Sequence, residues 1–198
     1  MHAQGAASSS ERDAERRFSR EIMPHLDAAY TLARWLVRND QDAEDIVQEA
    51  LLKAFRFFDG FKGENPRAWI ISIVRNTSYS WLEARRPMKS VPVDDVESEP
   101  YGAHRAAAVL VTTEDPESLL MRRMEQRRVN DAIAALPLEY REVIVLRELE
   151  ELSYKEISDV TKLPLGTVMS RLSRARQRLR KVLRAGLVQG AGYAEIDG

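Results

Sequence analysis

The sequence contains no cysteine among its 198 residues. This absence excludes a disulfide scaffold, a cysteine-based zinc site and a catalytic or redox thiol. The three histidines, His2, His25 and His104, are scattered and form no metal-ligand pair at helical spacing, and no glycine-rich phosphate loop is present. We therefore predict that the protein is not an enzyme and that it needs no metal, no cofactor and no small-molecule substrate.

Long apolar runs are also missing. No stretch is apolar over the length that a membrane-spanning helix requires. The first ten residues are small and polar, without the apolar core of a signal peptide. We expect a soluble cytoplasmic protein that does not insert into membranes.

Charge of one sign is absent from two blocks, although the net charge of the chain is only −1. Residues 167–184 contain seven basic side chains and no acidic one. Residues 40–49 contain five acidic side chains and no basic one. Such blocks within a nearly neutral chain indicate separate surfaces for different partners.

Prolines divide the chain into two units. Four of the eight prolines (Pro87, Pro92, Pro100 and Pro116) lie in an acidic stretch without helical periodicity. This stretch predicts a linker, 87–116, between an N-terminal domain, 12–86, and a C-terminal domain, 117–187. No convincing strand pattern appears, so the predicted fold is all-α, with two small helical domains joined by a flexible acidic linker.

Apolar side chains at spacings of three and four predict helices in both domains. In the first domain the stripes run from Phe18 to Leu36, from Ala43 to Phe57 and from Trp69 to Trp81, with Gly60 and Gly63 in the break before the third. In the second domain one stripe comprises Met124, Val129, Ile133 and Leu136, and Pro137 restarts a helix that contains Val143, Ile144 and Leu146.

The end of the second domain has the pattern of a helix-turn-helix. Ser153 and Glu156 form a capping box for a short helix to about Val160, and residues 161–164 predict a turn. The next helix has an apolar stripe (Leu165, Val168, Leu172, Ala175, Leu179 and Val182) opposite a basic, acid-free face. A solvated basic helix is the simpler interpretation, but the cap, the turn and that face together favour DNA binding. The residues predicted to contact DNA are Thr167, Ser170, Arg171, Arg174 and Arg178.

Two further faces lie in the first domain. Asp45, Gln48, Glu49 and Leu52 share one face of the second predicted helix. An ion pair with Lys53 is the structural explanation of Glu49, but a docking surface for a basic partner explains this acidic face better. The third predicted helix and the loop before it mix basic and aromatic side chains, including Arg75 and Arg85, as a track for unstacked single-stranded DNA requires.

These motifs resemble a known family. The stretch "LPLEYREVIVLRELEELSYKEISDVTKLPLGTVMSRLSRARQRLR" is similar to region 4 of extracytoplasmic-function (ECF) sigma factors, "DAEDIVQEALLKAF" to region 2.2, and "NPRAWIISIVRNTSYSWLEARR" to regions 2.3 and 2.4. The resemblance implies a sigma factor that directs RNA polymerase to promoters. Region 2.2 would dock on the β′ clamp helices, and region 4 would bind the upstream promoter element and rest on the β flap.

The same resemblance supplies further expectations. Lys62, Glu64 and Asn65 fall in the loop that captures a flipped promoter base, and Asn76 falls at a position that shapes its pocket. An anti-sigma factor is an expected partner. The linker could run through the RNA channel of the polymerase or serve only as a tether. The alternative function is that of a stand-alone helix-turn-helix regulator, which would bind its operator without polymerase.

Overall fold

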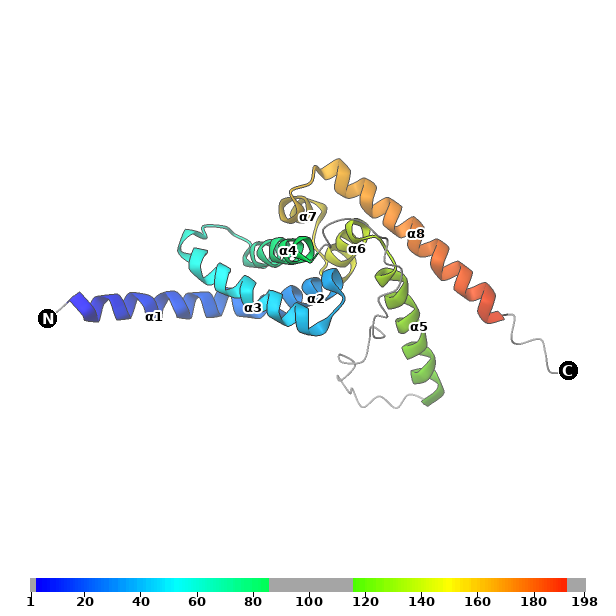
Figure 1. Ribbon diagram of the computed structural model, residues 1–198, viewed down its shortest axis with the longest axis horizontal. Coiled ribbons are helices and arrows are strands. Elements are labelled where there is room, and N and C mark those ends of the chain that lie inside the picture. Colours follow the sequence, from blue (N-terminus) through cyan, green and yellow to red (C-terminus); the bar gives the residue numbers. More distant parts are fainter. Residues whose placement is uncertain (1–2, 86–115, 192–198) are drawn as a thin grey trace.

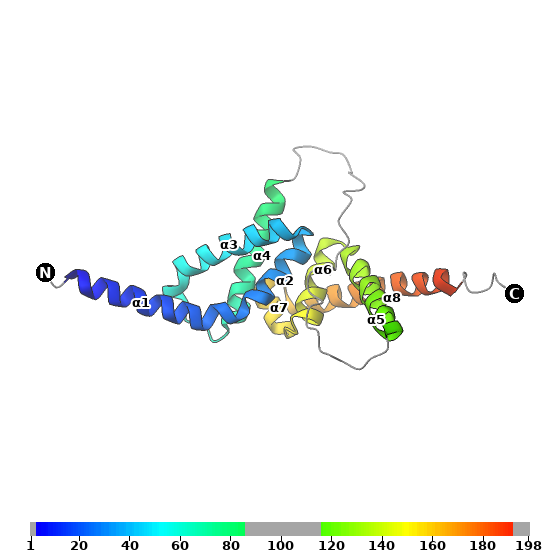
Figure 2. The same cartoon turned by 90° about the horizontal axis from the view of Figure 1, so that it is seen from below.

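The computed structural model describes residues 3–85 and 116–191, and side chains within 12–85 and 118–184. The predicted linker, 87–116, lies outside these residues except for Pro116. All regular structure in the described residues is helical, which confirms the all-α, two-domain prediction. Figure 1 shows α1 and α8 extending toward opposite ends of the molecule, and Figure 2 shows the same arrangement from below.

The first domain consists of α1 (Ala3–Ile22), α2 (Leu26–Val37), α3 (Asp40–Phe57) and α4 (Pro66–Ala84), with short 3₁₀ turns at η1 (Met23–His25) and η2 (Phe58–Gly60). The predicted stripe from Phe18 to Leu36 is thus divided between two helices, because Pro24 has no N–H to continue the first one. Asn39 caps α3 by accepting a hydrogen bond from the N–H of Asp42 at 2.9 Å.

Helix α4 buries a different face from the one predicted. Its buried side chains are Ile70, Ile71, Val74, Thr77 and Ser78, whereas Trp69, Ile73 and Trp81 of the predicted stripe are only partly buried. The face is broad because α4 packs against α2 and α3 on one side and against α7 on the other. A helix that lies between two domains cannot be assigned one buried stripe from spacing alone.

The second domain consists of α5 (Pro116–Ala134), α6 (Leu138–Ile144), the π-helical turn η3 (Val145–Leu149), α7 (Tyr154–Thr161) and α8 (Leu165–Ala191). Helix α6 and the first residues of η3 form a buried run from Arg141 to Leu146, which contains the predicted apolar residues Val143, Ile144 and Leu146. The stripe predicted for α5 is wrong at its N-terminal end, where Met124 and Val129 are exposed, and only Ile133 and Leu136 are buried.

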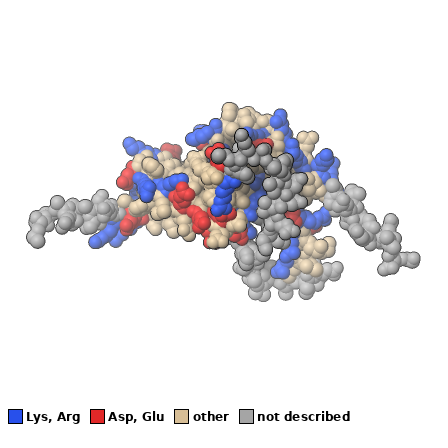
Figure 3. Space-filling model, in the orientation of Figure 1, with Lys and Arg blue, Asp and Glu red and all other residues tan. Residues whose placement is uncertain are grey.

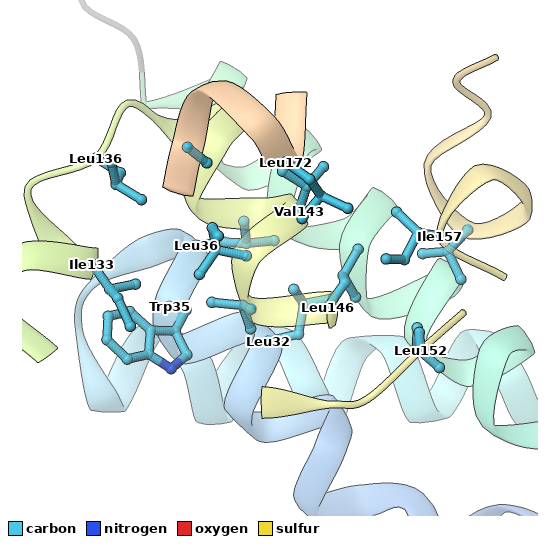
Figure 4. Packing of buried hydrophobic residues seen from close by; sticks show 14 of the residues in the cluster. Leu32, Trp35, Leu36, Ile133, Leu136, Val143, Leu146, Leu152, Ile157 and Leu172 are labelled. Carbon is cyan, nitrogen blue, oxygen red and sulfur yellow. The ribbon is translucent and has the colours of Figure 1, made fainter. Parts of the chain in front are cut away.

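The two domains share a hydrophobic core. One cluster, centred on Ile22, Ile46, Ala50 and Phe58, belongs to the first domain alone. The larger cluster joins Leu32, Trp35, Leu36 and Ile71 of the first domain to residues of the second. Figure 4 shows the α2 side chains facing Ile133, Leu136, Val143, Leu146, Leu172 and other residues of the second domain. The domains therefore pack directly on one another in this structure.

Candidate polymerase and nucleic-acid interfaces

The capping box predicted at the start of α7 is confirmed. The N–H of Ser153 donates to the Glu156 carboxylate at 2.8 Å, and the N–H of Glu156 donates to Ser153 Oγ at 3.2 Å. Helix α7 ends at Thr161, and the next residue, Lys162, takes the left-handed conformation (φ 59°) and turns the chain toward α8. The hydroxyl of Ser158 donates to the Leu163 carbonyl at 2.5 Å, which ties this turn to α7. The helix-turn-helix geometry thus follows from local sequence.

The Glu156 carboxylate accepts hydrogen bonds that stabilise its charged form, so its pKa lies below the usual value. The hydrogen bonds from Ser153 are the main cause. A lowered carboxyl pKa adds stability above the unfolded-state pKa, and this is lost as pH falls through the native pKa. We expect Ser153→Ala to lower the free energy of unfolding by about 1 kcal/mol at pH 7. The free energy of unfolding of the variant should also fall less steeply than that of the wild type as the pH is lowered. Urea unfolding at pH 7 and below pH 4.5 would measure both, with Ser19→Ala on exposed α1 as control. If both variants lost the same free energy of unfolding, Ser153 would not stabilise α7 as its cap.

Helix α8 buries Val168, Leu172 and Ala175 and leaves a basic face outward. The predicted stripe is wrong at its two ends, where Leu165 and Val182 are exposed. Of the predicted DNA contacts, Ser170, Arg174 and Arg178 are exposed, whereas Thr167 and Arg171 are partly buried. The N–H of Thr167 donates to the Pro164 carbonyl at 2.8 Å, so that amide is already engaged.

A groove of about 640 Å³ runs along the basic face of α8. Arg178 lies over the ring of Tyr140, with its guanidinium carbon 4.9 Å from the ring centroid. The lining contains no acidic side chain; it comprises Tyr140, Arg174, Gln177, Arg178, Arg180, Lys181 and Arg184. Figure 3 shows Lys and Arg side chains along this helix. Such a groove suits the phosphate backbone of a duplex.

The acidic face of α3 is solvent-exposed. Asp45, Gln48, Glu49 and Leu52 are all exposed, and the apolar Leu52 keeps 65% of its surface accessible. Figure 3 shows acidic side chains gathered over this part of the first domain. Glu49 also forms an ion pair with Lys53 at 2.7 Å, as the simpler explanation of this residue requires. An exposed i, i+4 pair of this kind contributes little to stability, so it leaves the docking interpretation open.

The predicted downstream-promoter residues divide into two groups. Lys62, Glu64 and Asn76 are exposed. Arg85 is exposed too; it pairs with Asp42 at 3.0 Å and stacks on Trp81. By contrast, Asn65 and Arg75 contact the second domain. The amide of Asn65 donates to Glu156 at 2.6 Å, and Arg75 Nε donates to Glu142 at 2.6 Å.

Asn65 has a structural role that the sequence interpretation missed. Its side-chain oxygen accepts a hydrogen bond from the N–H of Ala68 at 2.9 Å, which makes it the N-cap of α4, followed by Pro66 at the first helical position. The Asn-Pro sequence before an apolar run was the signal that could have identified this cap.

Glu142, whose carboxylate interacts with Tyr79, was also missed. Burial, and next the Glu142 carboxylate, raise the pKa of Tyr79 to about 12. Glu142 is completely buried although it belongs to a charged residue type that is seldom buried without a partner. Its place next to the apolar run from Val143 to Leu146 was the only sequence signal for this burial.

The comparisons with known proteins agree with this geometry. The sigma-70 region 2 model matches residues 22–87, and the sigma-70 region 4 model matches residues 126–179. The chain is 36% identical over 152 residues to the ECF RNA polymerase sigma-E factor of Haemophilus influenzae, covering 75% of this chain and 77% of that one. It is 34% identical over 176 residues to the RNA polymerase sigma-H factor of Pseudomonas aeruginosa, covering 87% and 89%.

Solved structures show the same likeness. The sigma factor RpoE from Bartonella quintana, in complex with the anti-sigma factor NepR, superposes with a TM-score of 0.62 at 27% identity, covering 85% of this chain and 98% of that one. CnrH, in complex with the cytosolic domain of CnrY, gives 0.60 at 25% identity, covering 90% and 95%.

Two helical domains that match sigma-70 region 2 and sigma-70 region 4, in that order, define a transcription initiation factor. The chain belongs to the ECF sigma factors of the sigma-70 family. The match to region 2 gives the first domain a role that a stand-alone helix-turn-helix regulator does not need, so that alternative is set aside. No described helix is both long and apolar enough to cross a membrane.

Proposed function

We propose that the first domain, 12–86, docks on the β′ clamp helices of core RNA polymerase through Asp45, Gln48, Glu49 and Leu52. The observation that supports this most directly is the exposure of all four side chains on one face of α3. An exposed leucine beside carboxylates offers both apolar contact and charge complementarity, which interfaces combine. The protein would then act where the polymerase acts, in the cytoplasm.

The same proposal assigns promoter DNA to two surfaces. The second domain, 117–187, would recognise the upstream element through the exposed face of α8 and rest on the β flap. Lys62, Glu64, Asn65, Arg75, Asn76 and Arg85 would bind the melted downstream strand. Arg75 lies over Tyr79 and Arg85 over Trp81. These pairs support the assignment, because single strands bind where cations can contact the backbone and aromatic rings can stack on bases.

An anti-sigma factor is the third proposed partner. Its support is the likeness to the sigma factor RpoE of Bartonella quintana, whose structure was solved in complex with the anti-sigma factor NepR.

The test of the upstream assignment compares two arginines on one helix. Arg174, nearer the start of α8, should contact a base edge, so Arg174→Ala should cost about 1–3 kcal/mol and relax the preference at one upstream position. Arg178 lies one turn farther along and stacks on Tyr140. Arg178→Ala should weaken binding to all sequences and reduce the salt slope by about one unit.

Transcription in vitro with core polymerase, on promoters carrying every single-base change in the upstream element, would measure both effects. Gln177→Ala, in the same groove but uncharged, serves as the control variant. Normal transcription by both arginine variants from every promoter would show that α8 is not the recognition helix.

A further inference from the structure

Two large apolar side chains are exposed at the start of α8, the helix that would recognise the upstream promoter element. Leu165 keeps 48% of its surface accessible, and Met169 keeps 51%. They are four residues apart, so they lie next to each other on one edge of the helix. Figure 1 shows the start of α8 at the outer edge of the molecule, directly after α7. We call these two side chains the apolar edge of α8.

Packing within the protein does not account for the apolar edge. The side of α8 that faces the core consists of Val168, Leu172 and Ala175. Neither Leu165 nor Met169 belongs to a core cluster of the described residues or packs against one. Single apolar residues on a protein surface need no explanation, but two neighbours on the edge of a recognition helix give that edge an apolar character.

The arginine that follows on the same edge is already paired. Arg176 lies seven residues after Met169, which is two turns along α8. Its Nε and Nη2 atoms donate to the Glu148 carboxylate at 3.0 and 2.7 Å. A guanidinium that binds a carboxylate has part of its donor fork occupied and is less available to a DNA phosphate. This edge of α8 is therefore suited to apolar contact rather than to charge recognition.

The residues around the apolar edge are small. A Cβ atom added to Gly166 would have no atom of the described residues within 4 Å, so packing inside the protein does not require glycine there. Ser170 and Ser173 are exposed. The hydroxyl of Ser170 donates to the Thr167 carbonyl at 3.0 Å, so it can only accept a further hydrogen bond. The start of α8 thus presents two bulky apolar groups among short side chains.

The chemistry of the major groove identifies a ligand for such groups. The C5 methyl group of thymine is an apolar feature there, and an apolar side chain distinguishes thymine by contact with it. The residues of a recognition helix that reach base edges are those near its N-terminus. Four residues rise about 6 Å along a helix and successive bases are about 3.4 Å apart, so the two side chains can reach methyl groups one or two base pairs apart.

We propose that Leu165 and Met169 select thymines in the upstream promoter element by contacting their methyl groups. The inference rests on the proposed function of α8. Because the apolar edge continues into the basic face that carries Arg174 and Arg178, DNA bound to that face would cover it as well. The apolar edge adds a base preference that phosphate contacts cannot supply.

The first experiment uses holoenzyme reconstituted from the full chain and core polymerase. Selection from promoters with a randomised upstream element gives the preferred sequence, which should contain thymine at one or two positions. Replacing each of these thymines with deoxyuridine removes only the methyl group. We expect promoter binding to weaken by about fourfold for each methyl group that is contacted. Deoxyuridine outside the element serves as the control and should leave binding unchanged.

Variants of the apolar edge connect the preference to its residues. Met169→Ala should bind the thymine and deoxyuridine promoters equally at one position, and Leu165→Ala should do so at another. Met169→Leu keeps an apolar side chain and should retain the preference for the methyl group. The matched control is Val182→Ala, which removes an exposed apolar side chain farther along the same helix. It should discriminate thymine from deoxyuridine as the wild type does.

Equal binding of wild-type holoenzyme to the thymine and deoxyuridine promoters would overturn the inference, as would a preferred element without thymine. If Arg174→Ala still relaxed the preference at one upstream position, α8 would remain the recognition helix and only the methyl contact would be wrong. The inference would also fail if Met169→Ala lost affinity for core polymerase and kept its preference for thymine. In that case the apolar edge would bind polymerase instead of DNA.

Discussion

Replacing both Asp45 and Glu49 with alanine should weaken binding to core polymerase by about 2 kcal/mol or more, roughly a 30-fold loss in affinity. Charges that pair across an interface leave their partners buried and unpaired when they are removed, which is why the loss is large. Folding should change little. The exposed Glu49–Lys53 ion pair is lost, but the repulsion between two carboxylates four residues apart is lost as well, and each effect is a few tenths of a kcal/mol.

The matched control is Asp59→Ala with Glu83→Ala, which removes the same charge from exposed positions outside α3. Core-polymerase affinity and thermal melting should be measured on both double variants. If the affinities of the two variants are equal, the docking face is wrongly assigned. If instead the melting temperature of the Asp45–Glu49 variant falls steeply, these carboxylates are structural.

The helices and their local caps could be predicted because the signals are contained in a few neighbouring residues. The box of Ser153 and Glu156 and the turn before Leu165 are examples, and both are present in the structure. The exposed face of α3 was also predictable, since side chains three and four residues apart share a face whatever surrounds the helix.

Contacts between the domains could not be predicted in this way. Arg75 and Glu142 are 67 residues apart, and no spacing rule joins them. Arg75 was therefore assigned to DNA from its charge and neighbours, and its carboxylate partner appeared only in the structure. The same cause explains why the stripe predicted for α4 was wrong. Contact with α7 buries side chains of α4 in addition to those buried by α2 and α3, so the buried face differs from the predicted one.

Trp35→Ala should have the largest effect on stability, because this side chain lies where the cores of the two domains meet. Trp35 is 2% exposed, and it faces Ile133 of α5 across the domain boundary (Figure 4). Removing a buried tryptophan leaves a cavity and costs about 3–5 kcal/mol. We expect a loss of this size in urea unfolding of the full chain, together with less cooperative unfolding of the two domains.

A double-mutant cycle with Ile133→Ala isolates the part of that loss that belongs to the interface. Residues in contact usually couple by about 0.5–3 kcal/mol, whereas distant ones add independently. Ile46 provides the comparison, because it is equally buried but lies in the cluster of the first domain alone. Coupling between Trp35 and Ile133, with none between Ile46 and Ile133, would establish that the two domains pack against each other in solution. If neither pair couples, the two domains unfold without contact, and the stabilising role assigned to Trp35 belongs to the first domain alone.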